Sequence, residues 1–122
     1  MHELSIAMSI VDAATEQAAK MGNVRVVSIH LKLGPLSGVI KEALLSAFEM
    51  AREGTPFQET RLVIEEMPVI AFCTKCQTER TIESIQEMRC PVCGTVSPDV
   101  RGGRELEISA MDVVDEIADP IG

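Results

Sequence analysis

Four cysteines in two pairs carry the clearest chemical signal in this sequence. Two residues separate the members of each pair and thirteen separate the pairs, in the order Cys73, Cys76, Cys90 and Cys93. Such pairs can close a tetrahedral metal site, because each pair offers two sulfurs from one tight turn. Pro91 restricts the second turn, and Gly94 after it can adopt positive φ. Four thiolates suit Zn²⁺ and leave no position open for a substrate, so we predict a structural zinc ribbon.

Three other uses of these cysteines stay open at this point. Two disulfides would fit an oxidising compartment, a Cys-x-x-Cys pair can exchange thiols, and a rubredoxin-like iron centre would use the same four ligands. Two matched pairs a short loop apart are seldom needed for thiol exchange. Because one metal site would use all the cysteines, we expect a reduced, cytoplasmic protein.

A histidine beside the first residue is the second chemical signal. The α-amine of Met1, the amide and imidazole of His2 and the amide of Glu3 offer four nitrogens that can lie in one plane. Such a set suits Ni²⁺ or Cu²⁺ better than Zn²⁺. At the start of a helix these amides have no intrahelical partner, so they can bind a metal without breaking the helix. From position alone, an incidental histidine at a frayed end is the more common outcome.

The composition argues against several other functions. The net charge is −8, and the segment 70–100 carries three basic against four acidic residues, so we expect no nucleic-acid binding. There is no spare cysteine, no Gly-rich phosphate loop and no Ser-His-Asp constellation, and His30 is expected at the surface; we therefore do not expect an enzyme. No basic leader and no apolar run of about 18 residues is visible, so we expect no membrane association.

The apolar pattern predicts the elements that position these residues. We expect helices over 3–21 and 39–53 and strands over 24–33, 61–66 and 105–111. Gly22 is expected to stop the first helix and Ser37 to cap the second. The predicted buried faces are Leu4, Ala7, Met8, Ile10, Val11, Ala14 and Ala18 in the first helix, Ile40, Leu44, Ala47, Phe48 and Ala51 in the second, and Leu106, Ile108 and Ala110 in the third strand.

These elements predict an α+β fold. Two helices lie on a three-stranded mixed sheet whose first two strands are parallel, and a four-cysteine zinc ribbon is inserted between strands two and three. Residues 1–69 together with 101–122 would form a nickel-binding domain, and 70–100 the zinc-ribbon domain. The acidic tail 112–122 is expected to be partly mobile. A homodimer formed by strand exchange at the Gly102-Gly103 hinge stays open.

Several segments together resemble the HypA/HybF family of hydrogenase nickel-insertion proteins. They are Met1-His2-Glu3-Leu4-Ser5, Gly34-Pro35-Leu36-Ser37, the helix containing Phe48 that ends in Gly54-Thr55, and the four cysteines with Pro91 and Gly94. The resemblance implies that His2 is a nickel ligand, that Met1 and Glu3 complete its environment, and that the cysteines hold a structural zinc ion. It also implies a nickel-handling GTPase and the [NiFe]-hydrogenase large subunit as partners, and for some members urease accessory proteins.

The sequence therefore supports two functional hypotheses. The first is a metallochaperone that carries transferable Ni²⁺ at its N-terminus and a structural Zn²⁺ in the ribbon. The alternative is a zinc-ribbon adaptor or regulator that binds protein and carries no transferable metal. Metal counting after exposure to nickel separates the two hypotheses.

Overall fold

The computed structural model describes residues 2–115. The chain divides into two compact units, each built from segments that are not contiguous in sequence. The helical unit comprises Met1–Leu31, Val39–Ile64 and Ile108–Gly122, and the cysteine unit comprises Lys32–Gly38 and Glu65–Glu107. The cysteine unit thus contains the whole of the predicted ribbon, and it also includes the short segment after the first strand.

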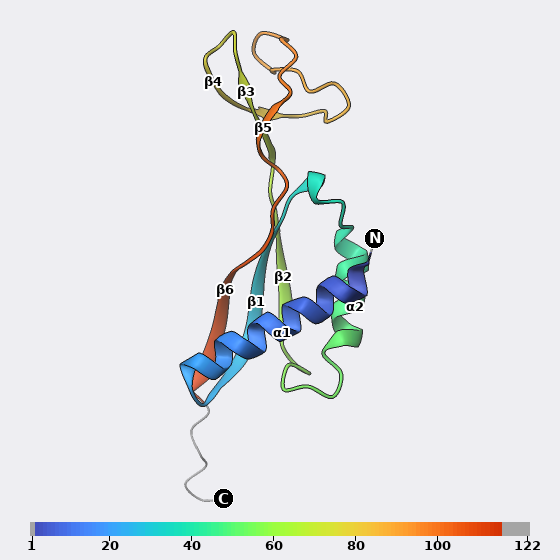
Figure 1. The fold of residues 1–122 in the computed structure, drawn as a ribbon, viewed down its shortest axis with the longest axis vertical. Helices are drawn as coiled ribbons and strands as arrows, with labels where there is room; N and C mark the ends of the chain where they lie inside the picture. Colours follow the sequence, from blue (N-terminus) through green and yellow to red (C-terminus); the bar gives the residue numbers. More distant parts are fainter. Residues whose placement is uncertain (1, 116–122) are drawn as a thin grey trace, which may run out of the picture. The chain divides into compact units, whose positions relative to one another are not determined.

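The first helix, α1, covers Glu3–Met21, as the sequence predicts (Figure 1). It ends at Gly22, whose φ of 92° is open to glycine and strained for other residues. The predicted buried face is wrong in part, because Leu4 and Met8 are 44% and 54% exposed. The innermost residues of α1 include two alanines, which let the helix backbone approach its neighbours closely; the buried set is Ala7, Ile10, Val11 and Ala14.

The second helix, α2, covers Lys41–Ala51 and packs against α1. Leu44, Ala47 and Phe48 are buried as predicted. The prediction that Ser37 caps this helix is wrong, because Ser37 ends the 3-10 helix η1, Pro35–Ser37. The cap position is occupied by Ile40, which has extended φ and ψ, makes no side-chain cap hydrogen bond and is 61% exposed rather than buried.

Three strands form the larger sheet in the order β2-β1-β6, with the bounds Arg61–Glu66, Val24–Leu33 and Leu106–Asp115 (Figure 1). The strands β1 and β2 run parallel, because Thr60 bonds to Val26 near their starts and Met67 bonds to Leu33 near their ends. The predicted crossover through α2 is the connection that a parallel pair requires.

The strand β6 runs antiparallel to β1, since Ser28 bonds to Asp112 whereas the His30 carbonyl accepts from Ser109. The α+β fold with a mixed sheet is therefore confirmed. Three details of this strand were predicted wrongly. Leu106 was predicted to be buried but is 38% exposed at the start of the strand. Ala110 is exposed, because the inward residues change parity between Ile108 and Met111. The strand was predicted to end at 111 but continues through Asp115, into the segment predicted as a partly mobile tail; the rest of that segment, 116–122, lies outside the described residues.

The core of the helical unit is aliphatic apart from two phenylalanines. Residues of α1, α2 and β1 contribute most of it, and the buried set is Ala7, Ile10, Val11, Ala14, Val26, Ile29, Leu31, Leu44, Ala47, Phe48 and Phe57. Partly buried residues of β2 and β6, including Ile64 and Val113, pack against its edge. This core leaves the first turn of α1 exposed at His2 and Leu4.

The cysteine unit contains a smaller antiparallel sheet in the order β4-β3-β5, with the bounds Thr78–Ile82, Val69–Cys73 and Asp99–Gly102. Only three buried residues form its apolar cluster, Val69, Ala71 and Ile82, supported by Leu36 and Met88. The segment between β5 and β6 passes close to the turn at Gly34, because Gly34 donates to the Glu105 carbonyl and Leu36 to that of Gly103. A Cβ atom on Gly34 would overlap the Gly103 carbonyl, so this approach requires glycine.

Candidate metal centres

The four cysteine sulfurs converge at the end of the small sheet. All four Sγ atoms lie within 4.8 Å of one another. The Sγ atoms of Cys73 and Cys93 are 3.5 Å apart, and those of Cys76 and Cys90 are 3.9 Å apart. A tetrahedral ion with metal–sulfur bonds of about 2.3 Å needs sulfurs about 3.8 Å apart. The cluster therefore fits a tetrahedral metal ion, and the cysteines are free rather than joined in two disulfides.

The two turns that carry the cysteine pairs have the same backbone conformation. In the first turn, Gln77 donates its N–H to the Cys73 carbonyl at 2.8 Å and has a φ of 56°. In the second, Gly94 donates to the Cys90 carbonyl at 2.9 Å and has a φ of 77°. The sequence predicted the positive φ at Gly94. Gln77 adopts the same conformation without being glycine, a strained geometry that four converging sulfurs can enforce.

Hydrogen bonds to sulfur prepare the cysteines for a cation. The backbone N–H of Cys76 donates to the Cys73 sulfur at 3.3 Å, and the Thr95 hydroxyl lies 3.2 Å from the Cys93 sulfur. The side-chain and backbone contacts from Thr95 lower the pKa of Cys93 to about 6. A thiol with such a pKa is largely ionised at neutral pH and ready to bind a metal.

The pKa of Cys76 is shifted in the opposite direction from that of Cys93. Arg80 interacts with its sulfur and lowers its pKa, but the neighbouring Cys93 sulfur and burial outweigh that contribution and raise the pKa of Cys76 to about 11. Four ionised sulfurs so close together repel one another, so the cluster keeps at least one proton until a cation replaces it. Metal binding at this site must therefore release protons.

The N-terminal residues lie at the start of α1. His2 is exposed and occupies the cap position, and its carbonyl accepts the first helical bond from Ile6 at 3.0 Å. The amides of His2 and Glu3 precede that first bond, as the nickel hypothesis requires. Glu3 is half-buried in the first turn. Met1 lies outside the described residues, and the metal-ligand cluster found among the described residues contains the four cysteines without a histidine.

The larger sheet brings together three polar residues that the sequence analysis did not connect. Ser28 donates to Asp112 Oδ2 at 2.5 Å, and His30 Nε2 lies 2.6 Å from the same oxygen. The bond from Ser28 and then that from His30 lower the pKa of Asp112. The sequence analysis expected no Ser-His-Asp constellation, but in the structure three such side chains lie within hydrogen-bonding distance of one oxygen. The serine bonds to the carboxylate rather than to the imidazole, so this arrangement does not activate a nucleophile.

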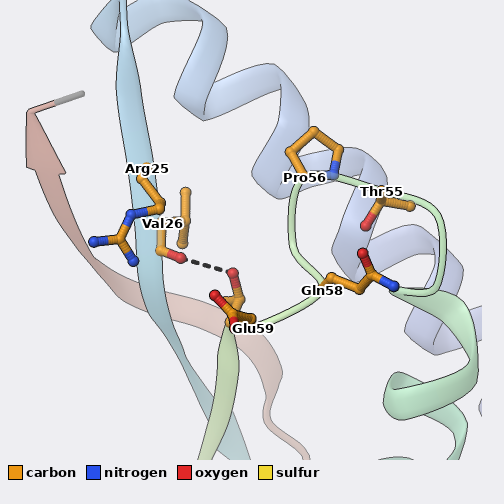
Figure 2. A pocket seen from close by; sticks show the side chains of 7 residues that line it. Arg25, Val26, Thr55, Pro56, Gln58 and Glu59 are labelled. Atoms are coloured by element: carbon orange, nitrogen blue, oxygen red, sulfur yellow. Dashed lines mark hydrogen bonds between the residues drawn. The ribbon is translucent and has the colours of Figure 1, made fainter. Parts of the chain in front are cut away.

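An open hollow of about 540 Å³ lies at the start of β1 (Figure 2). Its lining is mostly polar and comes from β1 and from the loop before β2: Arg25, Val26, Thr55, Pro56, Gln58, Glu59 and Thr60. The Thr60 hydroxyl donates to the Val26 carbonyl at 2.7 Å, which connects the loop before β2 to β1. Neither a cysteine nor a histidine lines this hollow, so it extends neither candidate metal site.

Comparison with known proteins identifies the family. The family model "Hydrogenase/urease nickel incorporation, metallochaperone, hypA" matches residues 1–113. The chain belongs to the HypA family. The "Hydrogenase maturation factor HypA" of Roseiflexus sp. (strain RS-1) is 44% identical over 95% of this chain and 94% of its own. The protein of the same name from Chloroflexus aggregans is 44% identical over 92% and 98%.

Two solved HypA structures share the fold. The solution structure of the Ni metallochaperone HypA from Helicobacter pylori superposes with a TM-score of 0.64 and 24% identity, over 95% of this chain and 100% of that one. A second solution structure of a HypA protein has a TM-score of 0.69 and 23% identity, over 95% and 98%. At these identities the superpositions establish the fold only.

Membership in the HypA family confirms the resemblance seen in the sequence. The family description names nickel incorporation by a metallochaperone, and the named relatives are hydrogenase maturation factors. In the described part of this chain, no helix is long and apolar enough to cross a membrane. Among the described residues, the four cysteines are the group whose donor atoms lie close enough together to hold a metal ion.

Proposed function

We propose that this chain binds Ni²⁺ at its N-terminus and delivers it for the maturation of [NiFe]-hydrogenase. His2 supplies the imidazole, Met1 its α-amine, and Glu3 a further amide nitrogen. The observation that carries the proposal is the exposed position of His2 at the cap of α1, ahead of the first helical hydrogen bond. The nickel incorporation named for the family supports it.

This site would hold nickel tightly enough to carry it and loosely enough to release it. Two deprotonated amides would offset the positive end of the helix dipole, which disfavours a bare cation there. An exposed plane of nitrogens leaves both axial directions open to an incoming ligand, whereas a closed cage would slow release. The amine and imidazole must be unprotonated to bind, so acid should release the metal.

The four cysteines would hold a structural Zn²⁺. Four sulfurs complete the coordination of the ion, so no position remains for a transferred ligand or a substrate. Two of the donors, Cys73 and Cys90, are buried, which favours retention over exchange. Because the apolar cluster of the cysteine unit has only three buried residues, the bound ion would supply much of the free energy that stabilises its fold.

The proposed partners follow from the family. They are a nickel-handling GTPase that supports insertion and the large subunit of a [NiFe]-hydrogenase, and the urease named in the family description is a second candidate recipient. A cytoplasmic location is supported by the four free thiols, which are typical of a reducing compartment.

Equilibrium nickel binding to the untagged protein tests the proposal. We expect one nickel and one zinc per chain, loss of specific nickel binding in His2→Ala, and unchanged zinc content in that variant. The matched control is His30→Ala, which removes the other histidine and should keep nickel. A residual N-terminal tag should also abolish binding, because it blocks the Met1 amine.

Two results would contradict the nickel site. Tight nickel binding by the tagged protein would remove the amine from the ligand set. One zinc and no nickel in the untagged protein would favour the alternative, an adaptor without transferable metal.

A further inference from the structure

The strand β6 forms a free edge of the larger sheet. In the order β2-β1-β6 it has β1 on one side, and in the described part of the chain no strand pairs with its other side. Alternate residues of such a strand direct their backbone N–H and C=O groups away from the sheet, where another extended chain can bond to them. With ten residues, Leu106–Asp115, β6 is longer than a typical strand of about five or six.

The other edge strand, β2, is protected against such pairing, whereas β6 is not. β2 has six residues, and the exposed side chains of Arg61, Glu65 and Glu66 at its ends carry charges of both signs. Charged side chains on a short strand are a common way to keep an edge from pairing. In contrast, the stretch 108–114 of β6 has one charged residue, Asp112, and its carboxylate is bound to side chains of β1. β6 is therefore the edge that is open to a further strand.

A mostly apolar hollow of about 340 Å³ lies at this edge. Its described lining comes from α1 and from four successive residues of β6, with no residue of β1 or β2: Ala13, Gln17, Met21, Ile108, Ser109, Ala110 and Met111. The hollow therefore lies on the side of β6 away from β1, where the C-terminal half of α1 passes the strand (Figure 1). A strand added to a sheet edge gains affinity from main-chain hydrogen bonds and specificity from hollows that receive alternate side chains, and this edge offers both.

The charge around this edge indicates the kind of partner. β6 carries three acidic side chains and no basic one: Glu107, Asp112 and Asp115. The residues of α1 that directly precede those lining the hollow add a further net negative charge: Asp12, Glu16 and Lys20. A second copy of β6 would bring two acidic strands together, which is destabilising, whereas a basic strand would be attracted.

We propose that β6 is the docking site for an extended segment of a partner protein in which apolar residues alternate with lysine or arginine. The segment would extend the sheet as a fourth strand, bond to the free backbone groups of β6 and place one apolar side chain in the hollow beside Met21 and Ala110. Its basic side chains would offset the acidic charge of β6. The hollow is lined by neither a cysteine nor His2, so the inference goes beyond nickel delivery and does not depend on it.

The test uses the full-length, untagged protein and a short fluorescent peptide in which lysine and valine alternate. We expect fluorescence anisotropy to show saturable binding and backbone amide NMR spectra to locate it on 108–115. One control peptide is methylated on alternate backbone nitrogens, which keeps the charge but removes the donors; another has glutamate in place of lysine. Both should bind about tenfold more weakly or worse, because one loses the main-chain bonds and the other places like charges together.

A matched pair of variants tests the site from the side of the protein. Ala110 is exposed and lines the hollow, so Ala110→Lys places a positive charge and a long side chain there. Ser46→Lys adds the same charge at an exposed position of α2. We expect Ala110→Lys to weaken peptide binding about tenfold or more and Ser46→Lys to stay within about twofold of wild type. The methylated peptide is tested on wild-type protein, so that result does not depend on the folding of a variant.

Amide hydrogen exchange identifies what occupies the edge. The outward amides of β6 should exchange fast in the protein alone and slowly with the lysine-valine peptide. Absence of saturable binding, equal binding of the methylated peptide, or spectral changes away from β6 would overturn the inference. Slow exchange of these amides in the protein alone would overturn it too: a dependence on protein concentration would assign the edge to a second copy, and independence to residues 116–122 of the same chain.

Discussion

The helical unit and the cysteine unit are stabilised in different ways. Among the described residues, eleven buried side chains from two helices, one strand and a loop form the core of the helical unit. In the cysteine unit only Val69, Ala71 and Ile82 form a buried apolar cluster, and four cysteine sulfurs gather beside them. Burial of apolar area can hold the first unit together, but three small side chains cannot offset the chain entropy of the second.

This difference between the units matches the two unlike metal sites that we propose. A closed set of sulfurs suits a role in folding, because the ion replaces a missing core. A site for a transferable ion needs exposed donors on an element that is already stable, and α1 is anchored by Ala7, Ile10, Val11 and Ala14 well away from its first residues. The stability of each unit thus determines what kind of metal site it can support.

Loss of a cysteine is the strongest way to test this separation. We expect Cys90→Ser to unfold the cysteine unit and to leave the helical unit folded, because structural zinc supplies about 10–16 kcal/mol of apparent binding free energy. Backbone amide NMR spectra should lose the dispersed signals of β3 and β4 and keep those of α1. Val92→Ser, in the same turn but at an exposed position, is the control and should keep both sets. Loss of the α1 signals as well would show that the two units are not independent.

A cavity in the core of the helical unit should destabilise that unit and leave the cysteine unit unchanged. Phe48 is 2% exposed, so Phe48→Ala should lower the free energy of unfolding of the helical unit by about 3–5 kcal/mol. Denaturant titrations followed by the helix signal in circular dichroism measure this loss. Zinc content should stay at the wild-type level under native conditions. Release of zinc at the same denaturant concentration as helix unfolding would show that the units unfold together.

The smallest effect is expected at the Ser28–His30–Asp112 cluster, which ties β6 to β1. A lowered pKa means that the folded state favours the ionised carboxylate of Asp112. The stability it contributes is therefore present above the ordinary value of 3.8 and is lost as the pH falls through the lowered pKa. Asp112→Asn should be less stable than wild type at pH 7, and the difference should narrow as the solution becomes more acidic than that value.

Denaturant titrations of both proteins across this pH range measure the effect. Asp12→Asn, at an exposed position of α1, is the control and should show no such convergence. A difference between wild type and Asp112→Asn that is constant with pH would mean that packing, rather than charge, connects Asp112 to β1.

Local signals in the sequence predicted much of this structure. The limits of α1, β1 and β2 were predicted to the residue, because a glycine stop, a change of periodicity and flanking turn residues act over a few positions. The limits of α2 were less accurate, since η1 inserts between Gly34 and Ile40 and moves the helix start away from Ser37. The positive φ at Gly94 followed from its place after a Cys-x-x-Cys turn, whereas nothing local marks Gln77 for the same conformation.

The sequence by itself determined the donor chemistry of this protein: two cysteine pairs whose spacing suits one tetrahedral ion, and a histidine at a helix start. Within each cysteine pair, and at the helix start, the donors are a few positions apart, so chain geometry alone brings these atoms within reach of one another. Only the tertiary structure decided how the two cysteine pairs meet and which polar side chains pair across the larger sheet. Cys76 meets Cys90 across 14 positions of sequence, and Asp112 meets Ser28 across 84 positions through the register of β6 on β1. Strand register has a period of two and is set by packing over the whole sheet, so no local pattern in the sequence specifies it.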